Sequence, residues 1–203
     1  MHDQVIIASV DCTGHGVSGA FMSITGYHLL NKAVQAARTL TASEILDNLN
    51  EEIKLELHGK GSNEDVQDGM DIALCIVDIK NKSLQYAGAN NPLYILRNRE
   101  IIQVKANKFS IGLTIGLSNQ KFANHKVQLE EKDELFLFSD GYADQLGGET
   151  GFEKFMYQRF RELLISIAGE PMEVQKRRLE ENFQKWKGNV DQLDDVLVIG
   201  FQL

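Results

Sequence analysis

The spacing of short hydrophobic runs in the middle of the chain constrains its fold more than any other sequence feature. Strand-like runs cover residues 72–79, 84–89, 93–96 and 101–104, and only a few residues separate each run from the next. Connections of this length suit antiparallel hairpins, because the crossovers that join parallel strands need a dozen or more residues. The chain is therefore predicted to form antiparallel sheets.

Helical patterns accompany these strands. Apolar residues recur every three or four positions from Ala20 to Val34, as on a helix. Thr41-Ala42-Ser43-Glu44 has the form of a capping box before a second helix that reaches Leu57. Two more amphipathic helices are predicted, at residues 152–167 and 172–186. Further strands are predicted at residues 5–10, 127–129, 134–138 and 196–201. Together these elements predict an α+β fold, with residues 1–203 as a single domain.

The composition excludes several classes of partner. A net charge of −8 argues against nucleic acids and anionic membrane surfaces, which attract basic patches. No apolar run approaches the roughly twenty residues of a membrane span, and the sequence predicts no signal peptide. Cys12 and Cys75 lack C-x-x-C spacing, so free thiols in a reducing compartment are expected. The predicted location is cytoplasmic, either as a free protein or as the cytoplasmic part of a larger sensor.

Aspartates stand at the ends of hydrophobic strands in three places. Asp11 follows the first strand and opens Asp11-Cys12-Thr13-Gly14-His15-Gly16, Asp140 precedes a glycine, and Asp194 precedes a second aspartate. Any one of them alone is more often a turn or cap residue. Three in the same setting favour a metal site, and their hard oxygen atoms suit Mg²⁺ or Mn²⁺.

Four motifs in this order make the chain recognisable: DCTGHGVSGAFMS, YAGANNPLYIL, LFLFSDGYADQ and DDVLVIG. The sequence resembles the SpoIIE-like branch of the metal-dependent serine/threonine protein phosphatases, the PPM or type-2C superfamily. The resemblance covers nearly the whole chain. It implies an antiparallel β-sandwich flanked by helices, in four α-β-β-α layers, with two Mn²⁺ or Mg²⁺ ions. It also implies hydrolysis of phosphoserine or phosphothreonine on a protein.

The resemblance also assigns metal ligands by position. Asp11 resembles the aspartate that bridges both metals, and the backbone carbonyl of Cys12 resembles an oxygen ligand. Asp140 and Asp194 resemble the two later metal aspartates, whereas the adjacent Asp195 is not expected to coordinate.

Three further residues have weaker assignments. His15 occupies the position of the family's Gly-His-Gly histidine, a candidate to protonate the leaving oxygen; the alternative is a histidine that only hydrogen-bonds the turn. Asp68 or Asp71 falls near the place of a third metal in some relatives. A polar residue that introduces a strand is the alternative interpretation for both.

The chain departs from the family at its start. The family opens with earlier strands that carry a Gly-Asp-Phe or Gly-Asp-Tyr motif, whose aspartate binds one ion. Asp3 cannot replace this aspartate, because it lies on the same strand as Asp11 and about 26 Å away if extended. Met1 is therefore interpreted as a truncation point. The expectation is a domain without its first strands, with one sheet edge unpaired or paired with another molecule. At most one well-held ion and weak or no activity are also expected.

The predicted function is the phosphatase output domain of a bacterial signal-transduction protein. Its expected substrate is a phosphorylated regulatory protein such as an anti-sigma-factor antagonist, and an N-terminal regulatory domain is expected to be missing. The two C-terminal helices are expected to cover the sheet, and they could also dock a partner or a second protomer, giving a homodimer. One alternative is an inactive domain that binds or scaffolds. Another alternative, a hydrolase of small phosphoesters, would need a deep pocket lined by basic residues. The sequence offers no compact basic cluster except Lys176-Arg177-Arg178, which on a helix is more often a solvated face.

Overall fold

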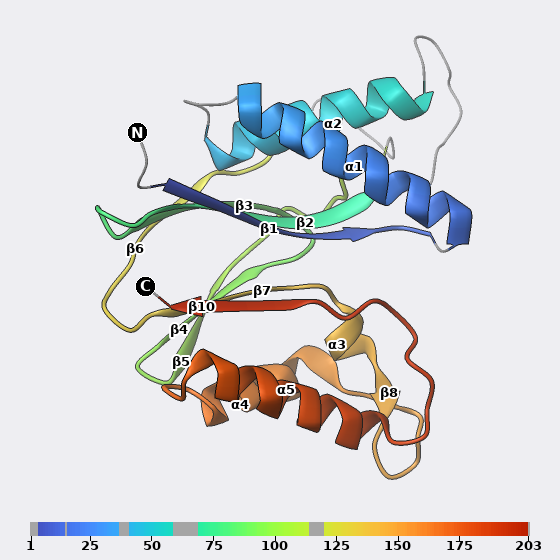
Figure 1. Ribbon diagram of the computed structural model, residues 1–203, viewed down its shortest axis with the longest axis vertical. Helices are drawn as coiled ribbons and strands as arrows, with labels where there is room; N and C mark the ends of the chain where they lie inside the picture. Colours follow the sequence, from blue (N-terminus) through green and yellow to red (C-terminus); the bar gives the residue numbers. More distant parts are fainter. Residues whose placement is uncertain (1–3, 15, 37–40, 59–68, 114–119, 203) are drawn as a thin grey trace. The chain divides into compact units, whose positions relative to one another are not determined.

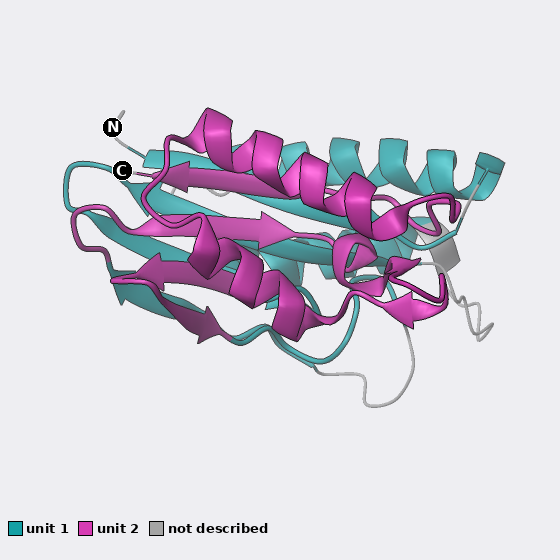
Figure 2. Cartoon of the chain, turned by 90° about the horizontal axis from the view of Figure 1, so that it is seen from below, with its two compact units in different colours: residues 1–92, 105–128 teal, residues 93–104, 129–203 magenta. Residues whose placement is uncertain are grey.

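The computed structural model describes residues 4–14, 16–36, 41–58, 69–113 and 120–202. Within it the chain forms two compact units (Figure 2). Unit 1 comprises residues 1–92 and 105–128, and unit 2 comprises residues 93–104 and 129–203. The single domain predicted for residues 1–203 stays a prediction.

Unit 1 contains a four-stranded antiparallel sheet. Its strands lie in the order β1 (Gln4–Cys12), β2 (Met70–Asp78), β3 (Ser83–Ala89) and β6 (His125–Gln128). Helices α1 (Gly16–Ala36) and α2 (Ala42–His58) cover one face of this sheet (Figure 1). The core between them is made mainly of aliphatic side chains, among them Leu29, Ile45, Leu46, Leu49, Ile53, Ile72 and Leu74.

Helix α1 forms where the sequence predicts it, but it buries a different face. The apolar residues of the predicted pattern are exposed near its start, at Ala20, Phe21, Ile24 and Tyr27, and the buried face carries Gly19, Met22, Gly26, Leu29 and Ala33. The glycines lie on the buried face because neighbouring atoms come too close to leave room for a side chain. A Cβ at Gly26 would stand 2.5 Å from Met70 Cε, and one at Gly19 would stand 2.6 Å from the Gly14 carbonyl oxygen.

Unit 2 contains a second four-stranded antiparallel sheet. Its strands lie in the order β10 (Val198–Gln202), β7 (Glu134–Phe138), β4 (Leu93–Arg97) and β5 (Glu100–Val104). Helices α4 (Met156–Ser166) and α5 (Met172–Lys187) pack against it. The predicted apolar faces of these helices are confirmed, and they bury an aromatic core that includes Tyr94, Phe136, Phe138, Tyr142, Phe155, Phe160 and Phe183.

The segment after β7 differs from the prediction. A short helix α3 (Gly141–Asp144) follows Asp140, and a two-stranded hairpin of β8 (Leu146–Gly147) and β9 (Glu153–Lys154) comes next. The helix predicted to start at residue 152 therefore starts at Met156. The sequence pattern misses the hairpin because each of its strands has only two residues.

The predicted fold class is confirmed: the chain is α+β, with antiparallel sheets and packed helices. Among the helices that the structure describes, none combines the length and the apolar character that crossing a membrane requires.

Candidate functional site

Asp11 lies at the end of β1, directly opposite Asp71 of β2. The antiparallel register pairs Asp11 with Asp71 and Cys12 with Met70. Side chains of directly opposed residues project from the same face, with Cβ atoms about 4.5–5.5 Å apart. The first predicted metal aspartate and a predicted third-metal residue therefore share one place in unit 1.

Asn90 holds the carboxylate of Asp71 in this place. Its side-chain nitrogen donates to Asp71 Oδ1 at 2.9 Å and to the hydroxyl of Ser110 at 3.0 Å. Asn90 adopts φ +56°, a left-handed conformation that asparagine tolerates better than most residues. Its backbone N–H donates to the Asn107 carbonyl at 2.8 Å, which fixes this turn. Sequence reasoning missed Asn90 as a site residue, although it lies in the quoted motif YAGANNPLYIL.

The start of the Asp11 turn is fastened to the strand beside it. The backbone N–H of Thr13 donates to the Gly69 carbonyl at 2.9 Å, and the Gly69 N–H donates to Thr13 Oγ1 at 2.6 Å. Gly14 then adopts φ +94°, which a glycine reaches without strain. His15 and Asp68 lie outside the described residues, so their predicted roles stay predictions.

The end of β7 and the start of the last segment are joined in unit 2 through Ser139. The Ser139 hydroxyl donates to the Asp195 carbonyl at 2.8 Å and accepts from the Leu197 N–H at 3.0 Å. The Ser139 N–H also donates to the Leu197 carbonyl at 3.0 Å. Ser139 is buried, so these hydrogen bonds join the segments that carry Asp140 and Asp194 away from solvent.

Gly141 lets these two segments touch. A Cβ at position 141 would stand 2.4 Å from the Asp195 carbonyl oxygen and 3.4 Å from Asp194 Cβ. Asp194 therefore lies against the residue next to Asp140. The carboxylate of Asp194 is fixed in turn, because its Oδ1 accepts the Asp195 N–H at 2.7 Å.

The chemistry of these groups fits a hard divalent cation, since they are carboxylate oxygens at rigid strand ends. The described residues contain no group of three or more His, Cys, Asp or Glu side chains placed to hold a metal ion. In unit 1 the structure brings Asp11 and Asp71 together on neighbouring strands. In unit 2 it packs Asp194 against Gly141, the residue that follows Asp140.

The cysteines are free thiols, as predicted, but only Cys75 is fully buried. Cys12 is half-buried and lines an apolar cavity of about 390 Å³ between β1 and α1. Burial raises the pKa of the Cys12 thiol, against a hydrogen bond with Ser23 that lowers it. The backbone carbonyl of Cys12 stays the predicted oxygen donor.

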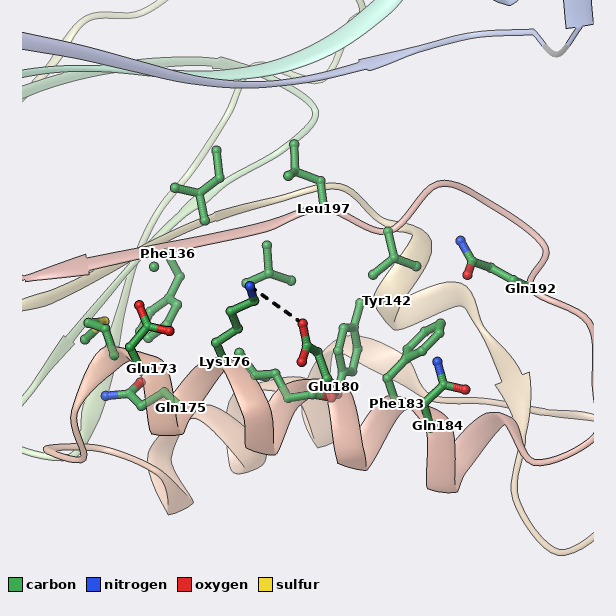
Figure 3. Close-up of a pocket in the computed structure, with 16 residues that line it drawn as sticks. Phe136, Tyr142, Glu173, Gln175, Lys176, Glu180, Phe183, Gln184, Gln192 and Leu197 are labelled. Atoms are coloured by element: carbon green, nitrogen blue, oxygen red, sulfur yellow. Dashed lines mark hydrogen bonds and ion pairs between the residues drawn. The ribbon is translucent and has the colours of Figure 1, made fainter.

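A cavity of about 590 Å³ lies between α5 and β10 in unit 2 (Figure 3). Its lining is mostly apolar, with Phe136, Leu179 and Phe183 among its residues, and neither Asp140 nor Asp194 contributes to it. Lys176 is its basic residue, and it pairs with Glu180 at 3.9 Å. This is not the basic pocket that the small-phosphoester alternative requires.

The antiparallel α+β fold is that of PP2C-type phosphatase domains. The family model described as Stage II sporulation protein E (SpoIIE) matches residues 1–203. The chain therefore belongs to the SpoIIE family, as predicted. A comparison with curated proteins finds no match.

Solved structures of PP2C domains have a similar fold. The SiaA-PP2C domain of Pseudomonas aeruginosa is 28% identical with a TM-score of 0.89, and the match covers 100% of this chain and 77% of that one. The PP2C phosphatase domain with a fragment of the regulatory domain of SpoIIE from Bacillus subtilis is 19% identical with a TM-score of 0.75, covering 98% and 55%. The catalytic domain of the serine/threonine protein phosphatase PstP, in complex with two manganese ions, is 16% identical with a TM-score of 0.64, covering 96% and 86%.

Proposed function

We propose that the chain is a metal-dependent phosphatase domain that hydrolyses phosphoserine or phosphothreonine on a signalling protein. The observation that carries the proposal is a packing contact in unit 2, where Gly141 lies directly against Asp194 and Asp195. A side chain at position 141 would separate these segments, so the glycine keeps Asp140 and Asp194 at one place. The SpoIIE family match supports the reaction class.

The residues that would hold divalent ions are Asp11, the Cys12 carbonyl, Asp140 and Asp194, with Asp71 as a further ligand. Ions of this kind, when bound, activate water and stabilise the negative charge of a phosphoryl group. The manganese ions in the PstP structure support Mn²⁺ or Mg²⁺ as the cofactor. His15 is proposed to protonate the leaving serine or threonine oxygen.

The biological setting is part of the proposal. The SpoIIE structure includes a fragment of a regulatory domain, which supports an output domain under regulatory control. A phosphorylated anti-sigma-factor antagonist is the kind of substrate expected, and a homodimer is the proposed assembly. The free thiols of Cys12 and Cys75 support a location in the cytoplasm.

The test is phosphate release from phosphoserine and phosphothreonine peptides with and without Mn²⁺. The Asp140→Asn and Asp194→Asn variants should each lose at least tenfold in Mn²⁺-dependent rate. Asp191→Asn is the matched control, because Asp191 is an exposed aspartate of the same segment, and its rate should not change. Equal rates for Asp194→Asn and the wild-type chain would contradict the proposal. Mn²⁺ binding through these aspartates without any phosphate release would favour the alternative of an inactive binding domain.

A further inference from the structure

Hydrolysis of a phosphate ester needs positive charge around the phosphoryl oxygens, because negative charge is spread over them in the transition state. The one compact basic cluster of the sequence does not supply it. Lys176 and Arg177 form i,i+4 pairs with Glu180 and Glu181 on α5, at 3.9 and 3.8 Å. Arg178 pairs with Glu170. These three cations are carried by α5, whereas Asp140 stands directly before α3.

Lys154 of the β8–β9 hairpin is placed differently. Its ammonium nitrogen lies 2.9 Å from Asp144 Oδ2. Asp144 is the last residue of α3 and comes four residues after Asp140, and its N–H donates to the Asp140 carbonyl at 2.9 Å. Side chains four residues apart on a helix lie on the same side, about 5–6 Å apart at Cβ. Lys154 is thereby held on the side of α3 from which Asp140 projects.

The hairpin that carries Lys154 is firmly anchored within unit 2. Leu146 pairs with Lys154 across the two strands, and the Phe155 N–H donates to the Gln145 carbonyl at 3.0 Å. The indole N–H of Trp186 donates to the same carbonyl at 3.1 Å. Gly147 packs so closely on the Trp186 backbone that a Cβ would stand 2.0 Å from the carbonyl oxygen. These contacts fix the backbone of the hairpin at Lys154.

The charge of Lys154 is secure, and half of its side chain remains accessible. The hydrogen bond to Asp144 and the charge of Asp144 raise the pKa of Lys154, and the charge of Asp140 adds to this effect. The side chain is 51% exposed, so a ligand can reach the ammonium group. An ammonium group is a common binder of phosphate as a point charge.

We propose that Lys154 binds the phosphate group of the substrate beside Asp140. The assignment rests on the proposed phosphatase function and adds to it a phosphate-binding residue on the β8–β9 hairpin. Asp144 is the positioning residue of this arrangement, because its carboxylate lies 2.9 Å from the ammonium group.

The test measures binding of inorganic phosphate to the full chain by calorimetry, with and without Mn²⁺. Lys154→Gln should weaken phosphate binding at least tenfold, whereas Lys154→Arg should keep it within about threefold because the charge remains. Lys176→Gln is the matched control, since Lys176 is another carboxylate-paired lysine of unit 2, and it should bind phosphate as the wild type does. Mn²⁺ affinity, measured separately, should be the same in all three variants.

The outcomes separate this assignment from the proposed function. Lysine-dependent phosphate binding without any hydrolysis would leave Lys154 as a phosphate ligand and contradict the phosphatase. Hydrolysis in a Lys154→Gln variant with unchanged phosphate affinity would leave the phosphatase and overturn the role of Lys154. Loss of thermal stability alone would mean that the pair with Asp144 is only structural, and a wild-type chain that binds no phosphate would also overturn the assignment.

Discussion

At the scale of single residues, Gly141 decides whether the predicted metal aspartates of unit 2 can meet. Gly141→Ala would place a Cβ 2.4 Å from the Asp195 backbone oxygen, so the two segments must separate. We expect at least a tenfold loss of Mn²⁺ affinity in calorimetry, together with about 1–3 kcal/mol lower stability.

Gly169→Ala separates the two effects. Gly169 has φ +81°, and a Cβ added there would have no neighbouring atom within 4 Å. Alanine at this position is therefore strained only by its backbone conformation. This variant should lose about 1–2 kcal/mol of stability and keep its Mn²⁺ affinity. A Gly141→Ala variant with normal Mn²⁺ affinity would mean that contact between these segments does not matter for the metal.

Asn90 is the second residue with a sharp prediction, because its amide fixes Asp71 opposite Asp11. Asn90→Gly keeps the left-handed backbone and removes only the side-chain bonds to Asp71 and Ser110. Mn²⁺ affinity should fall severalfold if Asp71 is a ligand, as proposed. Asn98→Gly is the control, since Asn98 has φ +50° in the β4–β5 turn, and it should leave Mn²⁺ affinity unchanged.

At the scale of elements, α1 shows how close approach outweighs helix propensity. Gly→Ala in a helix normally stabilises by about 1 kcal/mol. At Gly19 the new Cβ would meet the Gly14 carbonyl oxygen at 2.6 Å, so Gly19→Ala should destabilise by about 1–3 kcal/mol in urea unfolding. Ile24→Lys on the exposed face should change stability by less than about 0.5 kcal/mol. The opposite order of the two variants would show that the other face of α1 is buried.

The end of β4 gives a pH-dependent prediction. Arg97 binds Asp133 through two bonds, Nε to Oδ1 at 2.8 Å and Nη2 to Oδ2 at 2.6 Å. Burial alone would raise the pKa of Asp133, but the bonds from Arg97 and the Glu130 N–H outweigh it and hold the pKa below its ordinary value of 3.8. The stabilisation is present above that value and disappears as the pH falls through the lowered pKa.

Asp133→Asn should therefore cost about 2 kcal/mol of unfolding free energy at pH 7 and much less near pH 2. Urea unfolding of both proteins at the two pH values measures the difference. Glu130→Gln, which alters a more exposed partner of Arg97, should cost less at pH 7. A cost for Asp133→Asn that does not change with pH would exclude the ion pair as its origin.

The sequence predicts the long elements well because their patterns are long. The β2–β3 and β4–β5 hairpins and the apolar faces of α4 and α5 follow directly from residue periodicity. The prediction of a hairpin is wrong for β3 and β4, which lie in different sheets although they are close in sequence. The β8–β9 hairpin cannot be predicted this way, since strands of two residues are too short to show a period. The buried face of α1 is also hidden, because glycines that allow close packing look like weak helix positions in a sequence.

At the scale of the whole molecule, the motifs predict the family and the candidate ligands, but not the residues that position them. Asp11, Asp140 and Asp194 are visible because each ends or precedes a hydrophobic strand. Asn90 and Ser139 act through hydrogen bonds to residues 19 and 56 positions away. Such partners depend on strand register and turns, which no local pattern reveals.

The most direct test is a double-mutant cycle at Asp140 and Asp194, in which calorimetry measures the Mn²⁺ affinity of each variant. If both carboxylates hold the same ion, each Asp→Asn variant should weaken binding at least tenfold. The double variant should then lose less than the sum of the two free-energy changes, because residues that share a ligand are not additive. Unchanged affinity in either single variant, or strict additivity of the two, would contradict a shared metal site next to Gly141.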